Sequence, residues 1–183
     1  MSSCTEQEVE RLLPLVSDQR RQQALRFRHL AGRYACLQSY CMLQQLMECD
    51  TLPLFEYNTY GQPYWPDGPY FSISHCRTAI AVVVSDRPVG IDVESVRKGR
   101  PELIARTMNE REQQEISASA DSAKAFIRLW TQKEAVLKCR GTGIVDDLHS
   151  VLLPDKIADL SLRTWELSDA QTLCTICEAN PPE

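Results

Sequence analysis

Apolar positions between residues 18 and 47 recur every three or four residues, which is the spacing of one face of an α-helix. The side chains that line this face are Leu30, Tyr34, Leu37 and Cys41. The pattern therefore predicts one long helix over 18–47.

The next segments have the alternating, β-branched pattern that is typical of strands. A short strand is expected over 54–58. The stretch NTYGQPYWPDGP (58–69) holds two glycines and three prolines, so it is expected to be a structured loop. Further strands are then predicted over 70–74, 79–84 and 89–94.

The second half of the chain opens with a basic, glycine-containing loop, SVRKGRP (95–101). Pro101 suits the first turn of a helix, because its missing N–H has no partner to make there, and this helix is expected to run to about residue 117. Another helix is predicted over 122–139, ended by Gly141 and Gly143. Weaker strand patterns follow near 148–153, 161–167 and 171–178.

The order of helix followed by strands occurs twice, with its centre near residue 95. This order predicts an α+β protein of two similar halves, 1–94 and 95–183. A length of 183 residues accommodates one domain, or two small halves that share a core.

Composition narrows the class of protein further. A hydrophobic share of 43% and a charged share of 25% are those of an ordinary globular protein. No apolar run approaches the ~20 residues that cross a bilayer, and the first residues, MSSCTEQEVE, lack the pattern of a secretory signal. A cytoplasmic protein that does not insert into membranes is therefore expected. The net charge of −5 argues against a general nucleic-acid binder.

The cysteines are expected to be reduced thiols without a joint role. Cys174 and Cys177 have the spacing of a metal or redox pair, but they lie in a predicted strand, where positions three apart face opposite sides. A zinc site would also need a second pair of ligands, which the sequence lacks.

Two carboxylates in the predicted strand 89–94 are candidates for a metal site. Asp92 and Glu94 stand two apart, so both project from one face, while Ile91 and Val93 point into the core. Adjacent carboxylates repel each other unless a cation lies between them, and oxygen ligands of this kind suit Mg²⁺. The alternative is a solvated strand edge.

The helix predicted over 122–139 brings a second group of candidates. Trp130, Glu134 and Lys138 are spaced by four residues and share one face. Glu134 is a candidate third metal ligand, and Lys138 a candidate phosphate contact. The alternative is a packed tryptophan beside a surface Glu–Lys pair.

Phosphate-binding groups are also expected at the end of the strand 70–74 and on the first helix. Ser72, Ser74 and His75 in FSISHC form a cluster of donors suited to phosphate oxygens. A serine–histidine hydrolase is disfavoured, because no nucleophile elbow is present. Some of the first helix's arginines could clamp phosphate bidentately: Arg20, Arg21, Arg26, Arg28 and Arg33.

Taken together, the order GQP…FSISH…GIDVE…LWTQKEAVLK closely resembles that of the 4′-phosphopantetheinyl transferases of the surfactin-synthetase-activating type. The resemblance extends from about Arg20 to Gly143. It implies a monomer of two pseudo-symmetric α+β halves, each with a helix packed on a small antiparallel sheet. It also implies that coenzyme A and Mg²⁺ bind in the cleft between the halves.

The resemblance assigns roles residue by residue. The implied Mg²⁺ ligands are Asp92, Glu94 and Glu134. The implied contacts to coenzyme A phosphates are Ser72, Ser74, His75 and Lys138, with Arg20 and Arg33 near the 3′-phosphate. The loop Tyr60, Gly61, Gln62 and Pro63 is implied to lie along the adenine end by its backbone, and the family usually carries lysine at the position of Gln62.

The implied reaction is that of a holo-[acyl-carrier-protein] synthase: the phosphopantetheine arm moves from coenzyme A to a serine of an apo carrier protein. The serine hydroxyl attacks the β-phosphate and 3′,5′-ADP leaves. Glu134 is the candidate base, directly or through a metal-bound water, Lys138 stabilises the leaving oxygen, and His75 orients phosphate.

Two other classes of function stay open at this point. One is a metal-dependent nuclease, which uses similar carboxylate and lysine sets but is disfavoured by the acidic net charge. The other is a coenzyme-A-binding module without catalysis, which would be expected to lose a metal carboxylate. The carrier could belong to a fatty-acid, polyketide or peptide synthase.

A basic segment, RKGRPELIARTMNER (97–111), is the candidate surface for that carrier. It contains five basic and two acidic side chains, a local charge of +3 in a chain of −5. Because carriers of this family's reaction are usually acidic around the serine, a transient complex steered by charge is expected. The alternative is a solvated helix face with no partner.

Overall fold

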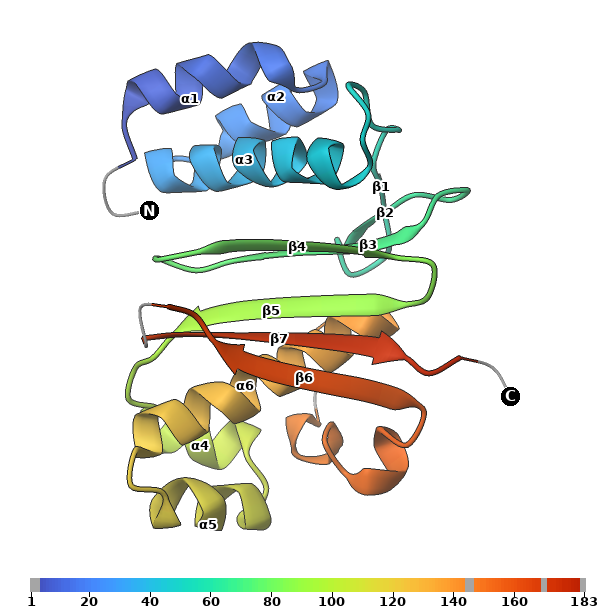
Figure 1. Cartoon of the computed structure of the whole chain (residues 1–183). Coiled ribbons are helices and arrows are strands. Elements are labelled where there is room, and N and C mark those ends of the chain that lie inside the picture. The colour runs from blue at the N-terminus through green and yellow to red at the C-terminus, as the bar shows by residue number, and fades with distance from the viewer. Residues whose placement is uncertain (1–3, 144–146, 169–170, 182–183) are drawn as a thin grey trace.

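The computed structural model describes residues 4–143, 147–168 and 171–181 of the chain. Its elements stack in layers, from helices formed by the first residues, through strands in the middle, to a second group of helices (Figure 1). The first layer contains α1 (Glu6–Leu12), the turn η1 (Leu13–Leu15), α2 (Asp18–Arg26) and α3 (Leu30–Leu46).

The prediction of one helix over 18–47 is wrong, because α2 ends at Arg26 and α3 begins at Leu30. Phe27 and His29 have extended backbone angles, so the chain folds back on itself between the helices. Nε of Arg20 donates to the carbonyl oxygen of Cys36 at 2.8 Å across 16 residues. In one continuous helix those residues would lie about 24 Å apart, at 1.5 Å per residue.

Strands of the N-terminal half form two hairpins. The antiparallel partners β1 (Glu56–Tyr57) and β2 (Pro63–Tyr64) shape the loop between residues 58 and 62. The longer β3 (Tyr70–His75) and β4 (Ile80–Ser85) confirm the strands predicted there. Apolar side chains of α3 pack against this second hairpin, and α3 therefore covers its sheet.

A three-stranded sheet has the order β5-β7-β6 and consists of β5 (Val89–Ser95), β6 (Leu160–Glu166) and β7 (Thr172–Ala179). The long helix α6 (Ser122–Arg140) packs on β5 and β7. The shorter helices α4 (Pro101–Thr107) and α5 (Glu110–Ala118) lie below α6 in Figure 1. The predicted α+β class, with helices on small antiparallel sheets, is confirmed.

Two predictions for the C-terminal half are wrong. The helix expected from Pro101 to about 117 is divided at Met108 and Asn109, because the Asn109 side chain accepts from the N–H of Glu112 and starts a new helix. Residues 148–153, where a strand was expected, begin with the short turn η2 (Leu148–Ser150), and a second turn, η3 (Pro154–Lys156), follows them. An aspartate cap and a proline favour these turns over a strand.

The strand β5 joins the two halves. It pairs with β7 through backbone hydrogen bonds, while on its other edge the N–H groups of Ile91 and Val93 donate to the hydroxyls of Ser72 and Ser74 on β3, at 3.1 and 3.2 Å. Ile91 and Val93 are buried, as predicted. The halves 1–94 and 95–183 stay a prediction, and β5 contributes to the packing of both.

Gly90 lies where β5 touches α6. A Cβ atom at Gly90 would come closer than 3.0 Å to the carbonyl oxygen of Ala135 and the amide nitrogen of Cys139. These are backbone atoms, so they cannot move aside as a flexible side chain can. The close approach of strand and helix therefore requires glycine at this position.

We expect Gly90→Ala to lower the free energy of unfolding by about 3 kcal/mol, because the added methyl group must push β5 away from α6. Urea denaturation followed by circular dichroism measures this effect. Gly32→Ala is the matched control, since its Cβ would meet the exposed ring of Phe27 at 2.9 Å, which can move. If the two variants unfold at the same urea concentration, β5 and α6 do not approach each other as closely at Gly90 as described.

None of the helices in the described ranges combines the length and the hydropathy that a membrane span requires.

Candidate active site

Asp92 lies at the centre of β5, facing β3 and α6. Its Oδ1 accepts hydrogen bonds from the Ser74 hydroxyl at 2.8 Å and from Nζ of Lys138 at 2.7 Å. The residue is only 5% exposed, and its Oδ2 has no hydrogen-bond donor among the described residues. A buried carboxylate oxygen without a partner is costly, so this atom is suited to a cation.

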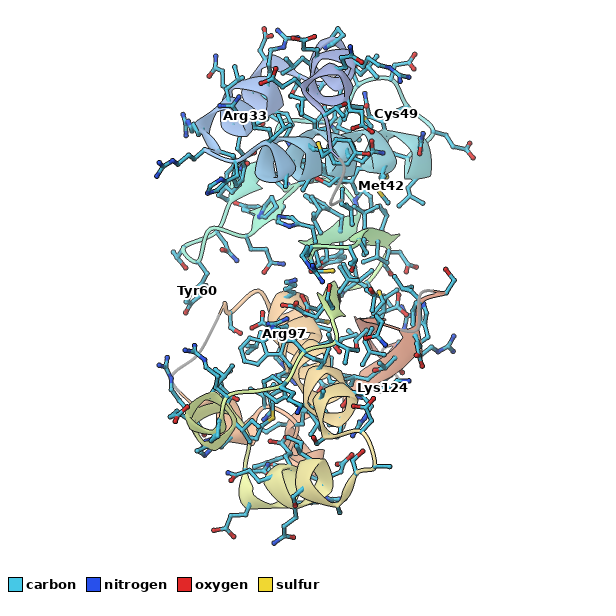
Figure 2. The ribbon with its side chains drawn as sticks, turned by 90° about the vertical axis from the view of Figure 1, so that its left-hand side faces the viewer. Arg33, Met42, Cys49, Tyr60, Arg97 and Lys124 are labelled. Carbon is cyan, nitrogen blue, oxygen red and sulfur yellow. The ribbon has the colours of Figure 1, made fainter. Side chains whose placement is uncertain are left out.

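Glu94 follows two residues later along β5, closer to solvent. Its Oε2 forms an ion pair with the guanidinium of Arg97 at 2.6 Å. Arg97 lies in the connection to α4 and its side chain is about half exposed, at the boundary of the C-terminal half in Figure 2. The pair is therefore free to open towards solvent when another cation competes for Glu94.

Glu134 lies on α6, one helical turn before Lys138. None of the described residues donates a hydrogen bond to its carboxylate. Burial raises the pKa of Glu134 above its ordinary value, and the negative charges of Asp92 and Glu94 raise it further, while Lys138 opposes them. Asp92, Glu94 and Glu134 therefore lie within one another's electrostatic field.

The carboxylates of Asp92, Glu94 and Glu134 are chemically suited to bind a divalent cation. The oxygen ligands are those that Mg²⁺ prefers, the buried Oδ2 lacks a donor, and mutual repulsion of the carboxylates would be relieved by a positive charge. As placed, the carboxylates turn to Lys138 and Arg97, and in the described ranges no three His, Cys, Asp or Glu side chains are grouped closely enough to hold a metal ion. The metal role of Asp92, Glu94 and Glu134 stays a prediction.

The structure gives the predicted phosphate ligands Ser72 and Ser74 a different set of contacts. Both are buried, and their hydroxyls accept from the N–H groups of β5, so they replace the backbone ladder between β3 and β5. Ser74 also donates to Asp92 and orients that carboxylate. Their contact with phosphate stays a prediction.

His75 ends β3 at the edge of the same site. Partial burial lowers the pKa of His75, and the positive charges of Lys138 and Arg20 lower it further. Both cations therefore act on one imidazole, and the negative charge of Glu94 opposes them. The role of His75 in binding a phosphate group stays a prediction.

The predicted phosphate contacts Arg20 and Arg33 have protein partners in the structure. Arg20 is 6% exposed and lies over the Phe55 ring, 5.3 Å from its centre. Its guanidinium donates to Cys36, Gln23 and Ser39. Arg33 donates through Nε to the carbonyl oxygen of Phe27 at 2.9 Å. Arg20 thus fastens α2 to α3, and the 3′-phosphate role of both arginines stays a prediction.

The loop between β1 and β2 lies against the C-terminal end of α6. Nε2 of Gln62 donates to the carbonyl oxygen of Lys138 at 2.8 Å, and Nδ2 of Asn58 donates to that of Gly141 at 2.9 Å. A cavity of about 500 Å³ lies beside this contact, lined by Asn58, Gln62, Trp65 and Lys138 among others. The predicted backbone contact of residues 60–63 with adenine stays a prediction, and Asn58 was not among the residues expected at the site.

The comparisons with known proteins agree with this geometry. The model of the 4′-phosphopantetheinyl transferase superfamily matches residues 88–176, which span β5, α6 and most of β7. The chain is 30% identical to 4′-phosphopantetheinyl transferase psf-1 of Bacillus pumilus, over 95% of this chain and 83% of the relative.

Two other relatives extend this comparison. The chain is 27% identical to a 4′-phosphopantetheinyl transferase of Bacillus subtilis, over 95% of this chain and 87% of the relative. It is 41% identical to enterobactin synthase component D of Escherichia coli over a shorter stretch, 37% of this chain and 30% of the relative. The chain belongs to the 4′-phosphopantetheinyl transferase superfamily, and it is a transferase of that class.

Proposed function

We propose that the chain moves the 4′-phosphopantetheine arm of coenzyme A to a serine of an apo carrier protein, with Mg²⁺ held by Asp92, Glu94 and Glu134. The observation that carries this proposal is the contact of Lys138 with Asp92, which brings the cation of α6 and the carboxylate of β5 together beside Glu134. Transfer from a pyrophosphate uses positive charge at the phosphates together with carboxylates that hold the metal ion.

Each residue then has a distinct role. When bound, Mg²⁺ would neutralise charge on the pyrophosphate of coenzyme A. Lys138 supplies a second positive charge, close to where the leaving phosphate oxygen becomes negative. Ser74 orients Asp92, and in this proposal His75 donates to a phosphate oxygen.

Glu134 is the base in this proposal. The described residues donate no hydrogen bond to its carboxylate, so one of its oxygens can accept a proton from the carrier serine. The carrier serine loses its proton to Glu134 as its oxygen forms a bond to the β-phosphorus. The bond from that phosphorus to the bridging oxygen breaks, and 3′,5′-ADP leaves with the bonding electron pair.

The release of 3′,5′-ADP tests this reaction. We expect chromatography to show it only when coenzyme A, Mg²⁺ and an apo carrier protein are all present, and a chelator should abolish it. Release without a carrier would indicate a hydrolase instead of a transferase. Absence of release with a panel of fatty-acid, polyketide and peptide carriers would contradict the proposal.

The basic segment 97–111 supports an acidic, transient partner. It contains α4 and directly follows β5, so it begins beside Glu94. Arg100 and Arg106 are exposed and have no acidic partner among the described residues, unlike Arg97, which contacts Glu94. Unpaired positive charge beside the site would attract the acidic surface of a carrier to a monomeric enzyme.

Charge reversal tests this surface. We expect Arg100→Glu/Arg106→Glu to raise the KM for the carrier about tenfold and to leave the KM for coenzyme A within about twofold, because complementary charge mainly governs encounter with the protein partner. Steady-state kinetics with each substrate varied in turn measures both constants.

Lys156→Glu/Arg163→Glu is the matched control, since both side chains are exposed and lie on η3 and β6, outside the segment 97–111. The wild-type KM for the carrier should also rise with salt, as exposed charges are screened over ~8–10 Å. If the double reversal and the salt series both leave this KM unchanged, the carrier binds elsewhere.

A further inference from the structure

Side-chain amides of the N-terminal half cap the end of the helix that holds the candidate base. Gln62 reaches the carbonyl oxygen of Lys138 across 76 residues, and Asn58 reaches that of Gly141 across 83 residues. The last carbonyls of a helix lack the usual partners of the helix interior, and that of Lys138 also accepts from the N–H of Gly141 at 3.2 Å. Asn58 and Gln62 supply donors there, so the two halves are joined at the C-terminal end of α6.

Hydrogen bonds within the loop between Asn58 and Gln62 hold its shape. Oδ1 of Asn58 accepts from the N–H groups of Tyr60 and Gln62, and the N–H of Asn58 donates to the carbonyl oxygen of Gln62 at 3.0 Å. Gly61 has a φ of +79°, which glycine adopts without strain. The loop can therefore transmit the position of α6 to the cavity that it borders.

Tyr60 makes a third contact across the same boundary. A Cβ atom at Gly143 would lie 3.0 to 3.2 Å from atoms of the Tyr60 side chain, so the tyrosine packs closely on the backbone that follows α6. In Figure 2 Tyr60 projects from the loop towards the C-terminal half. The amide contacts and this packing lie together at one edge of the molecule.

The cavity of about 500 Å³ connects the contacts of Asn58 and Gln62 with a candidate binding site, because both side chains line it. Its lining includes Asn58, Gln62 and Lys138 together with the aromatic residues Trp65 and Tyr70. This volume lies in the range of small-molecule sites, and aromatic walls with a few polar groups are typical of them. On the proposed function, a coenzyme A molecule whose pyrophosphate meets Lys138 has to extend past this loop.

We propose that Asn58 and Gln62 are positioning residues that hold the loop at the separation from α6 that coenzyme A requires. They set the affinity for coenzyme A and take no part in the chemistry. Nζ of Lys138 is fixed separately, by the carbonyl oxygen of Ile91 at 3.1 Å and by Asp92. Movement of the loop therefore leaves the reacting groups in place. This inference rests on the proposed function only for the identity of the ligand.

Amide-to-acid exchanges test this clamp, by which we mean the contacts of Asn58 and Gln62 with the carbonyls at the end of α6. Gln62→Glu puts an acceptor opposite the carbonyl of Lys138, at the negative end of α6, and we expect the Kd for coenzyme A by calorimetry to rise about tenfold. Asn58→Asp keeps the acceptor that shapes the turn but loses the donor to Gly141, so it should behave similarly. In steady-state kinetics the KM for coenzyme A should rise, while kcat and the KM for the carrier should stay within about twofold of the wild-type values.

Two further variants separate positioning from a general loss of structure. Gln62→Lys restores a donor that can reach the same carbonyl, and we expect the Kd to stay within about threefold of wild type. Gln114→Glu makes the same chemical change at an exposed site on α5 and should leave the Kd unaltered. Thermal melts of every variant establish that the folded fraction is equal.

The inference is overturned if Gln62→Glu and Asn58→Asp keep the wild-type Kd, or if Gln62→Lys binds as weakly as Gln62→Glu. A fall in kcat at unchanged KM would also overturn it, because the side chain would then act on the reacting groups. Failure of the wild-type protein to transfer the arm, with coenzyme A binding intact, would count against the proposed function and not against the clamp.

Discussion

Replacing Asp92 with alanine is expected to lower the rate of phosphopantetheine transfer about a thousandfold. The change removes a carboxylate from the proposed Mg²⁺ site and the partner that holds Lys138 and Ser74. Loss of a metal ligand together with loss of alignment of a phosphate-binding lysine removes about 4 kcal/mol of transition-state stabilisation. Initial rates with an apo carrier at saturating coenzyme A and Mg²⁺ measure the loss.

The fold of the Asp92→Ala protein is expected to survive. Lys138 keeps its bond to Ile91 and is about a quarter exposed, so its charge is not stranded in the interior. Asp155→Ala, at an exposed aspartate of the C-terminal half, serves as the control and should retain full activity. Full transfer by a well-folded Asp92→Ala protein would show that Asp92 has no role in the reaction.

Glu134→Gln is expected to lower kcat about a thousandfold while the Kd for coenzyme A changes less than threefold. Glutamine keeps the size of the side chain and one oxygen, but it cannot accept a proton from the carrier serine. Single-turnover kinetics for the rate, with calorimetry for coenzyme A binding, separates the two quantities.

Glu10→Gln on α1 is the matched control, because Glu10 is exposed and far from β5 and α6 along the chain. It should leave both constants unaltered. Equal losses of kcat and of coenzyme A affinity in Glu134→Gln would indicate that Glu134 only holds metal. An unchanged kcat would place the base elsewhere.

The sequence predicted best those elements whose pattern is local. β5 is an example: alternation alone indicates that Ile91 and Val93 are buried and that Asp92 and Glu94 lie on the other side, and the structure places them so. The helix α6 is another, because its apolar spacing and the glycine after Arg140 mark both its face and its end. Neither element depends on knowing what lies opposite.

Contacts between distant segments could not be predicted in the same way. Nothing near Phe27 interrupts the helical pattern, yet the bond from Arg20 to Cys36 favours a folded hairpin over a continuous helix. The seam made by Ser72 and Ser74 likewise exists only because β3 and β5 meet side by side. Arg20, Ser72 and Ser74, which were predicted to bind phosphate, thus form hydrogen bonds within the protein.

Lys133 shows the same limit within the motif LWTQKEAVLK. It is 1% exposed and donates to the carbonyl oxygen of Leu148, and it pairs with Glu112 at 2.8 Å. Burial lowers the pKa of Lys133, and its contact with Glu112 opposes that shift. The side chain therefore ties α6 to α5 and to η2, whereas Lys138, five residues later, reaches Asp92. The spacing in the motif shows that Lys133 and Lys138 lie on different faces of α6. Only the fold shows which residues each lysine contacts.

The intact mass of an apo carrier protein is the most direct test of the central claim. After incubation with this protein, coenzyme A and Mg²⁺, the carrier should gain the mass of one phosphopantetheine arm, and a carrier whose serine is replaced by alanine should not. If carriers from fatty-acid, polyketide and peptide synthases all keep their mass, while an established transferase modifies each of them in parallel, the account of this site as a phosphopantetheinyl transferase is contradicted.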